Sequence, residues 1–179
     1  PNFGFTAKHI NYLEVNDKGN KSLEVHYQIA YLDLKEKKYI DATKRFDFVA
    51  TYNSENYQDL KLKSSELAID ALVLAKNHKL IEQEAYKYSK LFKNKKIHFS
   101  RLSRNASLNL VKEVIEKPNA TKSDYLEAQK RLSNVTMVGI SRKERIQIAK
   151  ARVKIANELQ DVEGIISSAG SLYAIAPSD

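Results

Sequence analysis

Lysine and arginine side chains, the residue types that bind phosphate, are concentrated in the second half of the chain. Residues 1–89 hold thirteen Lys/Arg and thirteen Asp/Glu, whereas residues 90–179 hold seventeen and nine, which accounts for the whole net charge of +8. Between Lys90 and Lys154 the excess rises to +12. Clustered cations bind polyanions because binding releases condensed counterions. The asymmetry predicts a nucleic acid, DNA or RNA, or an acidic protein surface as partner.

The first basic cluster runs from Lys90 to Arg104 and contains six cations interleaved with Phe92 and Phe99. We expect it to form a connection between helices, where backbone donors are also free to bind phosphate. Aromatic rings beside the cations would suit stacked bases. The alternative is a solvated loop whose lysines serve solubility.

The second basic cluster lies on a helix that Ser141 and Glu144 begin as a capping box. At about 100° per residue, Lys143, Lys150 and Lys154 share the polar face. The arginines of this helix fall on or beside its apolar arc, where a guanidinium meets either an internal carboxylate or an external carboxylate or phosphate. If the helix faces a groove or a neighbouring subunit, we expect Arg145 and Arg152 to make the contact.

All predicted nucleic-acid contacts are basic and belong to these two clusters. They are Lys93, Lys95, Lys96, Arg101, Arg104, Arg142, Lys143, Arg145, Lys150, Arg152 and Lys154. We expect phosphate contacts without reading of bases, because no element has the shape to enter a groove of the duplex. The loop over Ser133–Ile140 is longer than the turn of a helix-turn-helix motif.

Residues that could carry catalysis are few. Asp47 followed by Asp59-Leu60-Lys61 has the spacing of metal-dependent nucleases, but this pattern is common by chance. The four histidines show no metal-ligand spacing, and the chain has no cysteine and no Gly-rich phosphate loop. We therefore expect a non-catalytic protein without a metal or cofactor, and keep a nuclease as a third alternative.

The elements that would position these clusters are predicted as an α+β fold. Ser22–Leu34 and Tyr39–Tyr52 alternate apolar and polar residues, which is typical of half-buried strands, and Phe5–Val15 alternates more weakly. The link over residues 35–38 is short enough for a hairpin. Residues 1–63 thus predict a three-stranded antiparallel β-meander with one apolar face.

Helical periodicity begins at Ser64, with Ser65 as a cap, and we expect a break near Asn77-His78. Further helices are predicted over Ser103–Glu116, which Pro118 stops, over Lys122–Leu132 after a cap at Thr121, and from Ser141 to Gly164. The helices would cover the sheet, so residues 64–164 form a helical basic region within a single domain over residues 1–179.

Residues 165–178 carry no charge and include five large apolar side chains, which predicts an arm that lies on a surface. The arm either folds back on its own domain or docks on another chain. The second case supports an alternative function, a structural or adaptor subunit of a larger assembly such as a virion, with self-association through residues 165–179. The absence of cysteine and of long apolar runs leads us to expect a cytoplasmic protein with no membrane partner.

Overall fold

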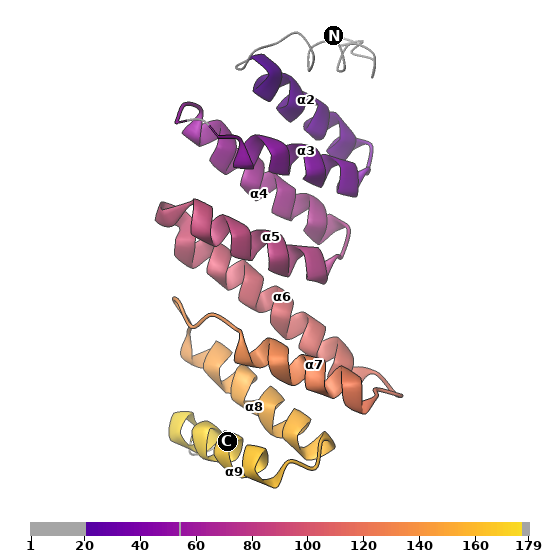
Figure 1. Cartoon of the computed structure of the whole chain (residues 1–179), viewed down its shortest axis with the longest axis vertical. Coiled ribbons are helices and arrows are strands. Elements are labelled where there is room, and N and C mark those ends of the chain that lie inside the picture. Colours follow the sequence, from indigo (N-terminus) through magenta and orange to yellow (C-terminus); the bar gives the residue numbers. More distant parts are fainter. Residues whose placement is uncertain (1–20, 54, 177–179) are drawn as a thin grey trace. The chain divides into compact units, whose positions relative to one another are not determined.

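The computed structural model describes residues 21–53 and 55–176, and every regular element in these ranges is a helix (Figure 1). The predicted α+β fold is therefore wrong, because none of the described residues lies in a strand. The strand predicted over Phe5–Val15 falls outside the described residues. The chain divides into two compact units between Asn77 and His78. One domain over residues 1–179 stays a prediction, since compact units of this kind occur both within one domain and as two.

The first unit contains α2 (Lys21–Lys35), α3 (Tyr39–Thr51) and α4 (Gln58–Leu74). Helix α3 packs against both α2 and α4. The chain reverses after α2 at Lys37, whose φ of 62° lies in the left-handed region. A turn was predicted at this link, but it joins two helices instead of two strands.

Helices form here because the buried residues follow a helical spacing that the alternation obscures. On α3 the buried side chains are those of Ala42, Thr43, Phe46, Val49 and Ala50. Their intervals of three and four residues mark one face of a helix. In contrast, Ile40 and Phe48, which the strand pattern placed inside, are 40% and 44% exposed. On α2, likewise, the strand pattern places Tyr31 inside and His26 outside, whereas in the structure His26 is buried and Tyr31 is exposed.

Helix α4 begins seven residues before the predicted cap at Ser65. Ser64 and Ser65 are buried in its interior, where their hydroxyl groups donate to the carbonyl oxygens of Leu60 and Leu62 at 2.7 Å and 2.6 Å. The predicted break near Asn77-His78 is confirmed, because α4 ends at Leu74 and the next helix begins at His78.

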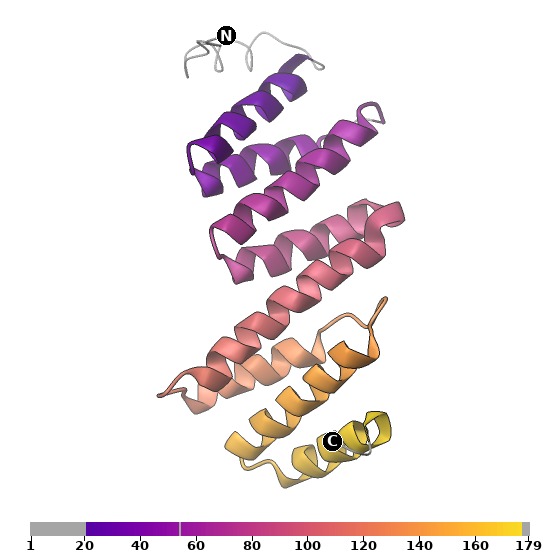
Figure 2. The ribbon, with the colours of Figure 1, turned by 180° about the vertical axis from the view of Figure 1, so that it is seen from behind.

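The second unit contains α5 (His78–Leu91), a 3-10 turn η1 (Lys93–Lys95), α6 (Lys96–Glu116), α7 (Lys122–Ser133), α8 (Arg142–Glu158) and α9 (Val162–Ile175). Each α-helix packs against the next, and α6 also contacts α8. Figure 2 shows the same succession from behind. Their shared core includes Val111 from α6, Leu132 from α7, and Ile148 and Ile155 from α8.

The loop predicted over Lys90–Arg104 is wrong, since most of this segment is helical. Helix α5 continues to Leu91 and α6 begins at Lys96. Phe92 and Phe99 are buried and pack on Tyr88, with Phe99 5.5 Å from it between ring centroids. These two rings are therefore part of the core and are not available to stack on bases.

The predicted capping boxes are present at the start of α7 and α8. Thr121 and Asp124 cap α7, and Ser141 and Glu144 cap α8, with both reciprocal hydrogen bonds formed in each box. The backbone N–H of Thr121, the ammonium of Lys117 and the Thr121 hydroxyl donate to Asp124 and lower its pKa to about 2. These caps depend on residues three apart, so the sequence alone locates them.

The helix predicted from Ser141 to Gly164 is two helices. Helix α8 ends at Glu158, and after Gln160, whose φ is 56°, Asp161 begins α9 by accepting a hydrogen bond from the Gly164 N–H at 2.9 Å. The predicted C-terminal arm is thus largely helix α9, which folds back on α8. Apolar side chains of α9 that stay exposed include Val162, Ile166, Ala169 and Tyr173.

Candidate functional site

A groove between α6 and α8 combines lysines with side-chain amides. Its volume is about 580 Å³. Its polar lining residues are Asn105, Asn109 and Lys112 from α6, and Gln147, Lys150 and Lys154 from α8. Leucine, valine, isoleucine and alanine side chains form the remaining lining, and none of the described residues that line the groove is acidic. The groove therefore offers only donors and amide oxygens beside an apolar floor.

Both rows of polar residues continue by one turn toward the start of their helices. Arg101 lies four residues before Asn105, and Lys143 lies four residues before Gln147, which places each on the same helix face as its row. Arg101 and Lys143 are both exposed. Each row spans eleven residues, or about 16 Å along the helix axis. The surface therefore carries five cations, Arg101, Lys112, Lys143, Lys150 and Lys154. We call it the α6–α8 face.

No acidic side chain of the described residues lines the groove itself, and one borders it on α6. Lys112 pairs with Glu116 one turn further along α6 at 3.7 Å, and both side chains are more than 60% exposed. An exposed pair of this kind contributes little and is easily displaced. The α6–α8 face therefore has an excess of positive charge in a hollow surface.

The lysines and the arginines of α8 lie on different sides of the helix, as the helical geometry predicted. Lys150 and Lys154 line the groove toward α6, whereas Arg145 and Arg152 line a second groove toward α9. The mean directions of these two sets differ by about 170° at 100° per residue. A flat partner surface therefore cannot contact these lysines and these arginines at the same time.

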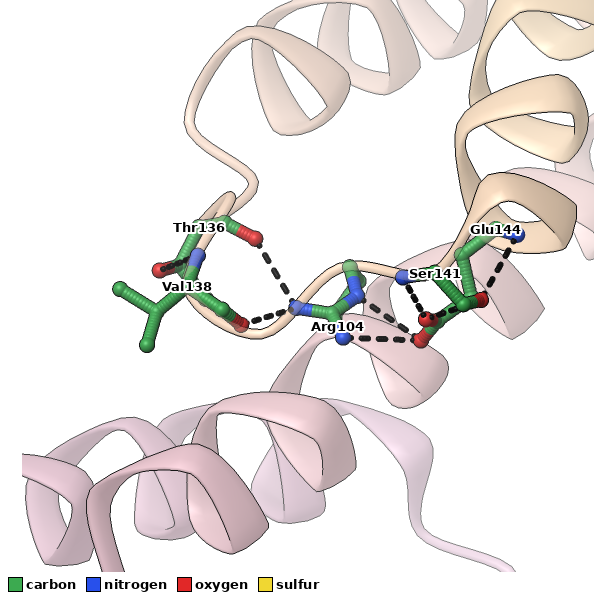
Figure 3. A network of polar contacts seen from close by, with 5 residues as sticks. All are labelled: Arg104, Thr136, Val138, Ser141 and Glu144. Atoms are coloured by element: carbon green, nitrogen blue, oxygen red, sulfur yellow. Dashed lines mark hydrogen bonds and ion pairs between the residues drawn. The ribbon is translucent and has the colours of Figure 1, made fainter.

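Arg104 is not available to a phosphate, because it is buried in a network within the second unit (Figure 3). Its Nε and Nη2 donate to Glu144 Oε1 at 3.0 Å and 2.8 Å. Its Nη1 donates to the carbonyl oxygens of Thr136 and Val138, both at 3.1 Å. Arg104 thus joins α6, the loop before α8 and the first turn of α8. We withdraw it as a nucleic-acid contact.

Glu144 serves both Arg104 and the cap of α8. Its Oε2 accepts hydrogen bonds from the Ser141 N–H at 2.8 Å and the Ser141 hydroxyl at 2.7 Å. Burial acts to raise the pKa of Glu144, but the hydrogen bonds from Ser141 and the Arg104 guanidinium outweigh it and lower the pKa. The carboxylate is therefore held ionised as a structural group.

Two further arginines of α8 bond to helix ends instead of to acids. Arg142 donates from Nε and Nη2 to the carbonyl oxygen of Ile175 at the end of α9, at 3.1 Å and 2.9 Å. Arg152 donates from Nη2 to the carbonyl oxygen of Leu132 near the end of α7, at 3.0 Å. A cation stabilises the C-terminal end of a helix, where carbonyl oxygens lack partners. Arg142 and Arg152 thus have internal partners, which are backbone carbonyl oxygens instead of carboxylates.

The remaining predicted contacts lie near the start of α6. Lys93 and Lys95 belong to η1 and Lys96 is the first residue of α6. Lys93 and Lys96 are exposed, and Lys95 is partly buried. None of the three lines the α6–α8 groove.

The larger cleft on the other side of α6 contains carboxylates that pair with Arg131. Its volume is about 680 Å³, and Glu82, Ser103, Ser107 and Arg131 are among its lining residues. Arg131 pairs with Glu82 and also with Glu127, and the Ser107 hydroxyl donates to Glu82. This cleft therefore holds carboxylates beside its cations, whereas no acidic side chain of the described residues lines the α6–α8 groove.

The residues of the nuclease alternative lie on two helices of the first unit. Asp47 is on α3, and Asp59 and Lys61 are on α4, where Lys61 is buried. In the described part of the chain, no three His, Asp or Glu side chains gather closely enough to hold a metal ion. We do not propose this alternative.

Sequence reasoning missed four residues of the groove, namely Asn105, Asn109, Lys112 and Gln147. The prediction began the second helix at Ser103 and treated the preceding residues as a loop. A helix begun at Lys96 would have placed Arg101, Asn105 and Lys112 on one face, because they recur at helical intervals. That spacing was the available signal.

No known protein family matches the chain, and comparisons with curated proteins and with solved structures gave no match either. Within the described residues, none of the helices has both the length and the apolar character needed to cross a bilayer.

Proposed function

We propose that this is a non-catalytic nucleic-acid-binding protein that contacts phosphates through the α6–α8 face. The observation that carries the proposal is the lining of the groove, three lysines and three amides without a carboxylate among the described residues. Lysine binds a phosphate as a point charge, and Asn and Gln side chains donate hydrogen bonds to phosphate oxygens. Such contacts fix a strand on the surface without reading its bases.

The dimensions of the face are consistent with a stretch of one nucleic-acid strand. A row of about 16 Å corresponds to about five phosphates at 3.4 Å of helix axis per strand. The two rows run along helices that point the same way, because α7 runs back between α6 and α8 (Figures 1 and 2). Five cations would therefore follow about five phosphates, and this number sets the salt dependence of binding.

The test is a fluorescence-anisotropy titration of the full chain against single-stranded and duplex DNA and RNA at about 50 and 200 mM salt. The double variant Lys143→Gln/Lys154→Gln removes two charges from the face. Lys130→Gln/Arg145→Gln is the matched control, because Lys130 lines the cleft on the other side of α6 and Arg145 the groove toward α9. We expect only the first variant to weaken binding. Equal weakening by both would mean that net charge alone attracts the nucleic acid.

A second candidate function, a subunit of a larger assembly, is favoured by the exposed face of α9. Val162, Ile166 and Tyr173 are 66%, 68% and 69% exposed, and they lie within about 40° of one another around the helix. Ala169 lies between them and is also exposed. A contiguous apolar face of this kind often marks a contact with another protein. We propose this face as the docking surface if the protein assembles.

Light scattering over a range of protein concentrations tests the assembly candidate. Self-association would raise the mass above 20.4 kDa, and Ile166→Gln/Tyr173→Gln would restore the mass of one chain. Leu126→Gln, which changes an exposed apolar residue on α7, is the control. A single-chain mass at every concentration would count against self-association through α9.

A further inference from the structure

A second groove lies on the other side of α8, between this helix, α9 and the loop before α8. Its volume is about 340 Å³. Its apolar lining residues are Met137, Ile140, Ile148, Ala149 and Ile175. A concave apolar surface of this size, with a few polar groups at its edge, is typical of small-molecule sites.

Two arginines form one edge of this groove. Arg145 is exposed and makes no hydrogen bond or ion pair with any residue that the structure describes. Arg152 uses only Nη2, for the carbonyl oxygen of Leu132, so its Nε and Nη1 have no partner in the described part of the chain. The two residues are two turns apart on α8, about 10 Å along its axis. Two guanidinium groups with unused donors therefore border one apolar surface.

The facing wall, from α9, is uncharged and carries three serines besides Ile175. Ser167, Ser168 and Ser171 line it, and no acidic side chain among the described residues lines the groove. The Ser171 hydroxyl donates to the carbonyl oxygen of Ser167 at 3.0 Å and is left as an acceptor for a guanidinium, whereas the Ser167 and Ser168 hydroxyls can donate to an anion. Since no internal carboxylate neutralises the arginines, an anionic group from outside the chain would complete the site.

We propose that this groove binds a small organic anion with an apolar body, whose carboxylate or phosphate head group lies between Arg145 and the α9 serines. The planar guanidinium suits either head group because it donates two parallel hydrogen bonds to both. The apolar body would cover Met137 and Ile140, of which Met137 is 51% exposed. This site is separate from the α6–α8 face, because α8 presents its lysines and these arginines in opposite directions.

Isothermal titration calorimetry of the full chain tests the proposal with sodium octanoate and octyl phosphate as probes. We expect at least one of the two to bind, and the comparison between them identifies the preferred head group. Acetate, inorganic phosphate and octyltrimethylammonium should bind at least tenfold more weakly, because each lacks either the apolar body or the negative charge. Equal binding of the octyl cation would overturn the proposal.

Single substitutions then locate the site. Arg145→Gln should weaken octyl-anion binding at least tenfold, and Met137→Gln should weaken it severalfold, while Lys143→Gln on the opposite side of α8 should leave it unchanged. Arg145 and Met137 are exposed, so circular dichroism should show unchanged helix content in both variants. Unchanged affinity in Arg145→Gln would overturn the assignment.

A competition experiment separates this site from the proposed function. Saturating oligonucleotide should leave octyl-anion binding unchanged. Lys143→Gln/Lys154→Gln should weaken binding of the oligonucleotide and leave binding of the octyl anion unchanged. Displacement of the octyl anion by oligonucleotide would mean that the groove belongs to the nucleic-acid surface, and the separate ligand site would be rejected. Failure of oligonucleotide binding would leave the calorimetric result standing.

Discussion

Replacing Arg104 with methionine should strongly destabilise the second unit without directly altering the α6–α8 face. The Arg104 side chain has no exposed area, and its four hydrogen bonds link α6 to Glu144 and to the carbonyl oxygens of Thr136 and Val138. Methionine fills a similar volume but leaves all these acceptors unpaired. Removing one partner of a buried ion pair costs about 3–5 kcal/mol.

Urea denaturation followed by circular dichroism measures this loss. With a urea dependence of about 2 kcal/mol per molar, a loss of about 4 kcal/mol lowers the midpoint by about 2 M. Arg101→Met is the matched control, since Arg101 lies three residues earlier on the same helix and is exposed. Its effect on the free energy of unfolding should stay within about 0.5 kcal/mol.

The pairing itself is tested by combining Arg104→Met with Glu144→Gln. If the ion pair carries the loss, the double variant is less destabilised than the sum of the two single variants, because each substitution removes the same interaction. Additive effects, or an Arg104→Met midpoint equal to that of Arg101→Met, would refute the structural role assigned to Arg104.

Three further predictions follow from the same contacts. Because folding lowers the pKa of Glu144, the contribution of this carboxylate to stability is complete above its ordinary pKa of 4.5 and is lost as the pH falls through the folded pKa. The difference in unfolding free energy between wild type and Glu144→Gln, measured by urea denaturation, should therefore shrink below about pH 4.5. A constant difference down to about pH 3 would contradict this prediction. Ser141→Ala removes the hydroxyl that caps α8 and should cost about 1 kcal/mol in the same assay, whereas Ser123→Ala, an exposed serine inside α7, should cost nothing measurable. Five phosphate contacts on a duplex give a slope of log binding constant against log salt concentration of about −4.5, which is about a 500-fold loss of affinity between about 50 and 200 mM salt. Lys143→Gln/Lys154→Gln should reduce this slope to about −2.7 and the loss of affinity to about 40-fold. An unchanged slope in anisotropy titrations would show that these lysines do not contact phosphates.

The sequence predicted the helix caps of the second unit and failed on the structural class of the first. The caps at Thr121 and Ser141 depend on partners three residues away, and both were located correctly. In α3, in contrast, the buried face includes Ala42 and Thr43, which a pattern of large apolar residues ignores. Tyr, Phe and Ile favour strands, but this preference is weak where packing supports a helix.

The sequence predicts the positive charge of the candidate site but not which basic residues belong to it. Arg101 and Arg104 stand three residues apart in one basic segment, and nothing in their local sequence separates a surface arginine from a buried one. The difference arises from Glu144, which lies forty residues further along and reaches Arg104 only when α6 and α8 pack. Long-range pairing of this kind cannot be read from composition or from helical spacing.

Helix α8 explains why one basic cluster supports two different proposals. Lysines occupy the side that faces the α6 groove, where a hydrated point charge on a flexible chain suits phosphates in variable positions. Arginines occupy the side toward α9, where two of them bond helix-end carbonyl oxygens and Arg145 borders the apolar groove. The planar guanidinium suits such fixed contacts near apolar surface. Exchanging the two residue types between the two sides would keep the net charge, and we expect it to weaken binding at both proposed sites.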